Sequence, residues 1–187
     1  MKSVMLSIKP KYCELIANGK KTVEVRKTRP KAEPPFKCYI YCTKAKNIYD
    51  LLWTEKEGVG VINRHANGKV IGEFICDEII FLGNISTENW KFLKGNVHEE
   101  HKKIVAQACL TEEELHNYGG QYALHICDLM IYDTPKELRT FNHPCIHEPY
   151  CVDCKYSLNE ARFCYDESVG CDRHLRRPPQ SWCYVEE

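Results

Sequence analysis

A helix gives way to a strand within one short stretch of this 187-residue chain, Asn18-Gly19-Lys20-Lys21-Thr22-Val23-Glu24-Val25-Arg26. The residues before it, 10–18, predict a short helix, because a proline suits the first turn and the apolar side chains recur on one face. Gly19 suits the left-handed residue that ends such a helix. The order helix, glycine, strand places the polar residues of this stretch within one short helix-to-strand passage.

Alternation begins at Thr22 and predicts a strand with two unlike faces. Val23 and Val25 point to one side, which we expect to be core, whereas Thr22, Glu24 and Arg26 point to the other. Together with Lys21, the second face brings a hydroxyl, a carboxylate and two cations into one small region. Such a set is suited to holding a polar ligand or to moving protons, and it could equally be an ion pair that joins the helix to the sheet.

Four segments of the chain, in this order, resemble the activating-signal-cointegrator homology (ASCH) domain, a small β-barrel related to the RNA-binding PUA fold. They are residues 7–12, 19–26, 72–75 and 122–126, and the likeness spans roughly residues 1–140. Its most specific part is the pattern Gly-x-Lys-Thr-x-x-x-Arg, formed here by Gly19, Lys21, Thr22 and Arg26. The resemblance predicts an α+β chain with a PUA-like β-barrel and short helices.

The resemblance also implies a cleft under the first helix that binds RNA, a nucleotide or a nucleoside. Its expected lining is Lys21, Thr22, Glu24, Arg26 and Glu73, with Tyr122 or Tyr118 available to stack on a base. The cations suit phosphate, and the hydroxyl and carboxylates suit a base edge or a ribose hydroxyl. Because carboxylates repel phosphate, the set favours a base or sugar over the backbone.

An enzymatic alternative comes from the same resemblance. A bacterial branch of the superfamily hydrolyses N4-acetylcytidine with a lysine matching Lys21, a threonine nucleophile and a glutamate matching Glu73. In this chain Glu24 stands where that threonine would be. A carboxylate can activate water but cannot replace a hydroxyl nucleophile. Amidohydrolysis of an acylated nucleoside therefore remains an alternative to binding, and the residues leave open whether the chain is an enzyme.

Composition and charge limit the partners and the cellular compartment that we expect for the protein. The formal net charge is +0 at pH 7, so binding to nucleic acid would depend on local patches such as the lysines and arginines at residues 20–27 and 173–177. No stretch has the length and apolarity of a membrane-spanning helix, and residues 1–9 do not form the apolar run of a signal peptide. We expect a cytoplasmic protein without a membrane partner.

Further elements follow from periodicity and turn residues. Strands are predicted over residues 36–43, 69–82 and 121–132, and a helix over 97–110. Thr111 and Glu114 form a capping box that starts another helix, which should end at Gly119. Thr134 followed by Pro135 predicts one more helix start.

The chain has 12 cysteines, and six of them fall after residue 144. Without an export signal, this density favours metal ligation over disulfides. We predict a structural zinc ion bound by Cys151, Cys154, Cys164 and Cys171, since four thiolates close a tetrahedral site. The spacing leaves His174, Cys145 and His147 open as replacement ligands.

The sequence thus predicts three parts: an ASCH domain over 1–140, a cysteine-rich zinc module over 141–180, and a final strand over 181–187 that returns to the first part. Residues 141–180 contain few large aliphatic side chains, so that module would depend on metal to fold. Binding of RNA, a nucleotide or a nucleoside is the predicted function, and a protein-interaction adaptor that uses the zinc module is a further alternative.

The zinc prediction has a direct test. Protein purified without chelator should carry about one equivalent of zinc by elemental analysis, because four thiolates so close together in the sequence bind the ion tightly. Cys154→Ser should lower the zinc content and loosen residues 141–180 to proteolysis while the main domain stays folded. Metal-free protein from a chelator-free preparation would contradict the prediction.

Overall fold

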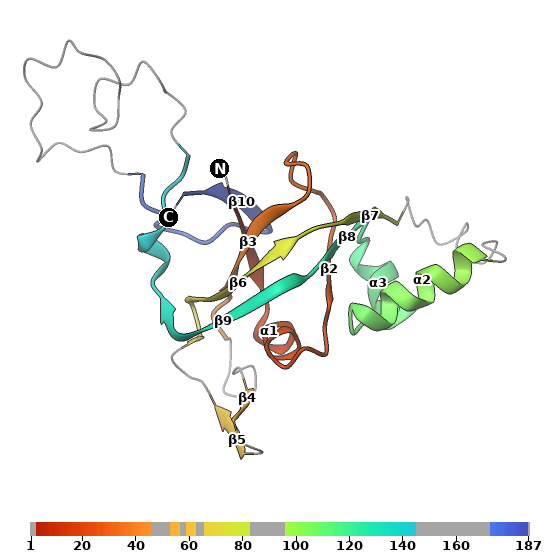
Figure 1. Ribbon diagram of the computed structural model, residues 1–187, viewed down its shortest axis with the longest axis horizontal. Coiled ribbons are helices and arrows are strands. Elements are labelled where there is room, and N and C mark those ends of the chain that lie inside the picture. The colour runs from red at the N-terminus through yellow and green to blue at the C-terminus, as the bar shows by residue number, and fades with distance from the viewer. Residues whose placement is uncertain are drawn as a thin grey trace, which may run out of the picture.

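The protein was analysed as a computed structural model, which describes residues 3–45, 53–56, 59–62, 66–82, 96–144 and 173–186. Figure 1 shows sheets at the centre, with α1 beneath them and α2 and α3 at one side. Within the described ranges no helix has the length and apolarity that crossing a membrane requires. The helices and strands run in the order β1 (Ser3–Ile8), α1 (Pro10–Ala17), β2 (Val23–Arg26), β3 (Phe36–Cys42), β4 (Trp53–Lys56), β5 (Val59–Ile62), β6 (Val70–Cys76), β7 (Ile79–Phe81), α2 (Asn96–Gln107), α3 (Glu112–Tyr118), β8 (Tyr122–His125), β9 (Cys127–Lys136), a 3-10 turn (Leu138–Thr140) and β10 (Trp182–Val185).

The largest sheet has five strands in the order β10-β1-β3-β6-β9. Strands β1 and β3 are parallel, and the other neighbours in this sheet are antiparallel. Side chains on both faces are buried, as alternation along β1 shows: Val4 and Leu6 join the cluster beneath α1, whereas Met5 joins the cluster on the opposite face. A sheet buried on both sides is a rigid platform for the elements at its edges.

A second sheet, in the order β2-β8-β7, carries the two later helices. Val23 and Val25 of β2 pack with Ile104 and Ala108 at the C-terminal end of α2 and with Leu115 of α3. Their burial holds both helices against β2 (Figure 1). This packing brings α3 and the end of α2 close to the residues that follow α1.

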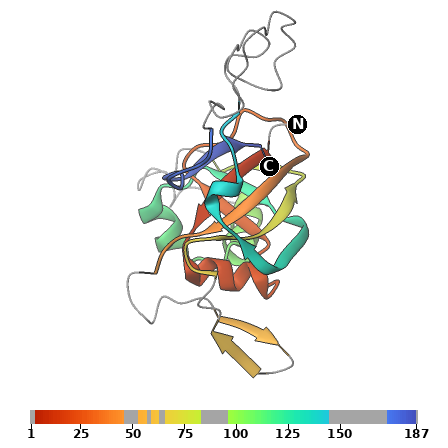
Figure 2. The same ribbon diagram turned by 90° about the vertical axis from the view of Figure 1, so that its left-hand side faces the viewer.

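The expected closed barrel is not found among the described strands, which form sheets of five, three and two strands. The two-stranded sheet, β4 with β5, projects away from the others in both views (Figures 1 and 2). Two predicted long strands are also interrupted. Asp77 and Glu78 separate β6 from β7, and Ile126 separates β8 from β9, so the halves of each predicted strand belong to different sheets.

The predicted boundaries of the first helix and of α3 are confirmed. The first helix starts at Pro10, and Gly19 adopts a positive φ of 68° directly after it. In α3 the capping box of Thr111 and Glu114 is complete, and Gly119 closes the helix with φ 66°. The helix start predicted at Thr134 is wrong, because β9 continues to Lys136 and only a 3-10 turn follows. Pairing of Lys136 with Val70 keeps this segment extended.

The end of the chain returns to the main sheet, where β10 pairs antiparallel with β1 (Figure 2). Ser7 ties the preceding segment down: its amide donates to the Ser181 carbonyl at 3.0 Å and its hydroxyl donates to the Pro179 carbonyl at 2.6 Å. Residues 178–180 are therefore fixed beside the C-terminal end of β1, next to the start of α1.

Substitution of Thr111 measures how much the N-terminal cap of α3 contributes to stability. The Thr111 hydroxyl accepts from the Glu114 amide at 3.0 Å, so Thr111→Ala should lower the free energy of unfolding by about 1 kcal/mol. Thr111→Ser retains the capping hydroxyl and should stay close to the wild type. The measurement is urea unfolding followed by circular dichroism. Equal stability of the two variants would show that the cap does not hold α3.

Candidate functional site

Three charged side chains from one turn and strand are buried under the first helix. Lys21, Glu24 and Arg26 have exposed fractions of 3%, 6% and 5%. The expected division of β2 into a core face and a polar face is therefore incomplete, because all four residues of the strand are buried. Burial of charge is costly unless each group is paired, so the contacts among these three side chains matter for folding as well as for function.

Glu24 forms ion pairs with both cations. Its Oε2 is 3.3 Å from the Lys21 Nζ, and its Oε1 is 3.1 Å from an Arg26 terminal nitrogen. One carboxylate thus compensates part of two positive charges, and the three groups together keep one net positive charge. This residual charge lies where water has little access.

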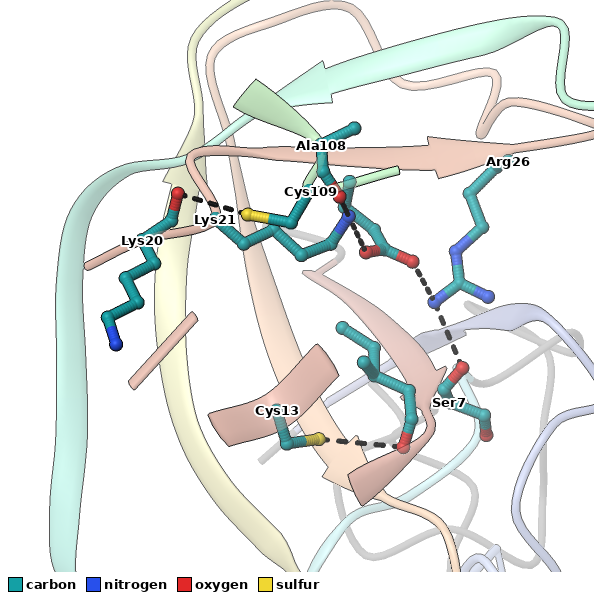
Figure 3. Close-up of polar contacts among 9 residues, drawn as sticks. Ser7, Cys13, Lys20, Lys21, Arg26, Ala108 and Cys109 are labelled. Carbon is teal, nitrogen blue, oxygen red and sulfur yellow. Dashed lines mark hydrogen bonds and ion pairs between the residues drawn. The ribbon is translucent and has the colours of Figure 1, made fainter. Parts of the chain in front are cut away.

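Each cation also donates to a backbone carbonyl. The Lys21 Nζ donates to the Ala108 carbonyl at 2.7 Å, at the end of α2, where the helix leaves carbonyls unpaired. Arg26 donates to the Ser7 carbonyl at 2.9 Å, at the end of β1. Figure 3 shows this continuous set of contacts from Ala108 to Ser7. The charged group therefore joins α2, β2 and β1.

Two polar atoms of the group are left without a hydrogen bond among the described residues. They are the Oε2 atom of Glu24, despite its closeness to Lys21, and the Nε atom of Arg26. One is an acceptor and the other a donor. Buried polar atoms nearly always have hydrogen-bond partners, so this acceptor and this donor are the atoms of the charged group whose hydrogen bonding is incomplete.

These side chains line a cavity of about 560 Å³. Its walls come from the end of β1, from α1, from α3 and from the segment that precedes β10. Besides the charged group, the lining consists of Ser7, Ile8, Lys9, Tyr12, Val25, Thr43, Leu110, Glu114, Asn117, Tyr118, Pro178, Pro179 and Gln180. The volume lies within the usual range for small-molecule sites.

Two tyrosines give the cavity its aromatic surface. The Lys21 Nζ lies 5.1 Å from the centre of the Tyr12 ring, and the Lys27 Nζ lies 5.3 Å from that of Tyr118. Burial raises the pKa of Tyr12 and of Tyr118, and the charge of Glu24 acts in the same direction on both. Both hydroxyls are therefore neutral at physiological pH. Tyr118 is 39% exposed, which leaves its ring accessible at the edge of the cavity.

The other residues expected in the cleft lie outside its lining. Glu73, on β6, accepts from Lys37 at 2.6 Å and from the Tyr132 hydroxyl. Burial raises the pKa of Glu73, but these two hydrogen bonds outweigh it and leave the pKa below its ordinary value. Tyr122 packs against Phe81, with ring centres 5.3 Å apart. Thr22 bonds through its backbone to Gln107 and Ile126.

The sequence analysis named Tyr118 only as an option and missed several other residues of the cavity. Tyr12 was not singled out, because its ring is typical of the apolar face of a helix, and Glu114 and Asn117 are placed by the capping box that positions α3. Pro178 to Gln180 had no local signal, because their place depends on the pairing of β10 with β1. The proposed zinc ligands Cys151, Cys154, Cys164 and Cys171, and their possible replacements Cys145 and His147, lie outside the described residues, so zinc remains a prediction.

The sequence model of the ASCH domain matches residues 6–127, well over half of the chain, and the protein belongs to the ASCH domain family. Among solved structures, the chain resembles "ASCH from Zymomonas mobilis" at 18% identity and a TM-score of 0.53, covering 100% of this chain and 89% of the other. It likewise resembles a serine-to-alanine mutant of that protein at 18% identity and a TM-score of 0.52, with the same coverage of both chains. At this identity the likeness concerns the fold. No curated protein matches the sequence.

The role of Glu24 generates a stability prediction. Glu24→Gln leaves Lys21 and Arg26 buried without a countercharge and should lower the free energy of unfolding by about 3–5 kcal/mol. Glu33→Gln is the matched control, since it removes a carboxylate that is 82% exposed and paired with Arg29, and it should cost less than about 1 kcal/mol. Urea unfolding measures both, and similar losses would mean that Glu24 does not balance the cations.

Proposed function

We propose that this ASCH-domain protein binds single-stranded RNA and takes one base into the cavity beneath α1. One observation carries the proposal: Glu24 and Arg26 line a cavity large enough for a base, and each has one buried polar atom, an acceptor and a donor respectively, without a hydrogen bond among the described residues. Membership of the ASCH domain family, which is generally associated with RNA binding, supports the same class of ligand.

The chemistry of the cavity suits a base edge. A base presents amino or imino donors beside carbonyl or ring-nitrogen acceptors, and a carboxylate accepts from the former while a guanidinium donates to the latter. Glu24 and Arg26 offer this combination in neighbouring side chains, which are joined through other atoms, the Glu24 Oε1 and an Arg26 terminal nitrogen, at 3.1 Å. A base that hydrogen-bonds to both atoms would remove, in the complex, the free-energy cost that their missing hydrogen bonds impose on the unbound protein.

Charge and aromatic surface support RNA over a neutral small molecule. The buried group has one net positive charge, so it favours carbonyl oxygens or a nearby phosphate. Tyr118 lies at the accessible edge of the cavity and Tyr12 forms part of its wall. Bases in single-stranded RNA are commonly recognised by stacking on such rings. Double-stranded RNA keeps its bases paired and stacked, so it would not present a base to the cavity.

The hydrolase alternative finds no support in the arrangement. That mechanism needs the equivalents of Lys21 and Glu73 at one site. Here Lys21 contacts Glu24 and the Ala108 carbonyl, whereas Glu73 bonds to Lys37 and Tyr132. Glu24 also stands in place of the threonine nucleophile. We therefore propose binding, and we leave an adaptor role of the zinc module to be tested separately.

Tyr118 provides the test of the binding site. Loss of base stacking typically costs about 1–3 kcal/mol, so Tyr118→Ala should weaken binding of a fluorescein-labelled single-stranded RNA by roughly 5- to 150-fold. Fluorescence anisotropy titration at fixed salt gives the dissociation constant. The ring is partly exposed at the end of α3, so the variant should remain folded.

Tyr122→Ala is the matched control, because it also removes a partly buried tyrosine but one that faces Phe81 outside the cavity. It should leave the affinity for RNA unchanged once both variants are shown to fold by circular dichroism. An RNA affinity that falls with Tyr122→Ala and not with Tyr118→Ala would move the site to the face of β8.

A further inference from the structure

A second cavity, of about 610 Å³, opens beside the first. Its lining comes from the end of β3, from the 3-10 turn after β9 and from residues 174–178. The residues that matter for its chemistry are Tyr41, Lys44, Arg139, His174, Leu175 and Arg176. The proposed base-binding site uses none of these side chains.

The floor and the rim of this cavity differ in character. Tyr41 and Leu175 are buried, with exposed fractions of 3% and 1%, and form an apolar floor. Lys44, Arg139 and Arg176 are exposed and form a cationic rim. The carboxylate in the lining, Glu137, is already paired with Lys69 at 3.0 Å, outside the cavity lining. The cations in the lining outnumber this carboxylate, so the net charge of the lining is positive.

Backbone hydrogen bonds hold the segments that carry Arg139 and Arg176 of the cationic rim. The Leu175 amide donates to the Phe141 carbonyl at 2.8 Å, and the His143 amide donates to the Arg173 carbonyl at 2.8 Å. Leu175, Tyr41 and Phe141 belong to one buried cluster on the outer face of the five-stranded sheet. The two segments that carry Arg139 and Arg176 are thus held side by side, and the spacing of their charges is set by the fold.

The two cavities adjoin each other at Pro178. This residue lines both of them, and the adjacent residues Thr43 and Lys44 line the first and the second respectively. Ser7 fixes the separating segment through its hydrogen bond to the Pro179 carbonyl. An RNA chain that enters the first cavity and leaves it across Pro178 therefore reaches the cationic rim of the second.

We infer that the second cavity is the path of the RNA backbone, which leaves the base-binding cavity across Pro178 and places its next phosphates against Lys44, Arg139 and Arg176. The inference rests on the proposed function and extends it from one base to a strand. Its physical basis is the sequence of groups along this path. A donor and an acceptor suited to a base come first, and exposed cations suited to phosphate follow. The site therefore selects an oligonucleotide over a single nucleotide.

The test compares two ligands and two double variants. The ligands are a ten-nucleotide single-stranded RNA of mixed sequence and the four ribonucleoside monophosphates. Lys44→Gln with Arg139→Gln removes two rim charges, and Lys31→Gln with Lys103→Gln removes two exposed charges that line neither cavity. Anisotropy for the decamer and calorimetry for the monophosphates give affinities over a range of salt concentrations.

We expect the rim variant to bind the decamer about tenfold more weakly than the control variant. The slope of log affinity against log salt should fall by about 0.7 for each phosphate that the rim variant no longer neutralises. Affinity for the monophosphate that binds best should not change.

Equal decamer affinities in the rim and control variants would overturn the path, and the base site would still stand if Tyr118→Ala weakens binding. An equal loss of affinity for decamer and monophosphate in the rim variant would also overturn the path. Wild-type protein that binds neither ligand would refute the proposed function itself.

Discussion

A single carboxylate placed between two buried cations constrains the rest of this structure. Glu24 approaches Lys21 and Arg26 to within 3.3 and 3.1 Å, and all three are more than nine-tenths buried. Removing one partner from such a group leaves a charge that neither water nor protein compensates, at a cost of several kcal/mol. The positions of α2, β2 and β1 relative to one another must therefore satisfy this contact.

The same contact links folding to the proposed function. Lys21 and Arg26 also donate to the Ala108 and Ser7 carbonyls, so the charged group is oriented before any ligand arrives. Ser7 in turn holds Pro179 and Ser181, which brings the end of the chain to the edge of the cavity. Within the charged group, Glu24 and Arg26 each retain one atom that has no hydrogen bond in the described part of the chain. A site with most of its polar atoms already fixed loses little further freedom on binding.

Local chemistry made part of this predictable from sequence. The ends of α1 and α3 follow from Gly19, Gly119 and the capping box at Thr111, because these residues act within one turn. The nomination of Lys21, Glu24 and Arg26 rested on a strand pattern and a family resemblance, and the structure brings them together. Features that depend on distant pairing were out of reach. Strand-forming residues lie on both sides of Asp77 and of Ile126, so the sequence could not reveal that each predicted strand divides between two sheets. Glu73 was expected in the cleft, whereas its side chain bonds to Lys37 and Tyr132.

Photochemical cross-linking tests the central claim most directly. A single-stranded RNA containing 4-thiouridine, irradiated on the wild-type protein and digested, reports by mass spectrometry which residues lie against the base. The account predicts adducts on peptides from the walls of the first cavity, namely α1, α3 and residues 178–180. Adducts confined to other parts of the chain, with none on these three segments, would contradict it.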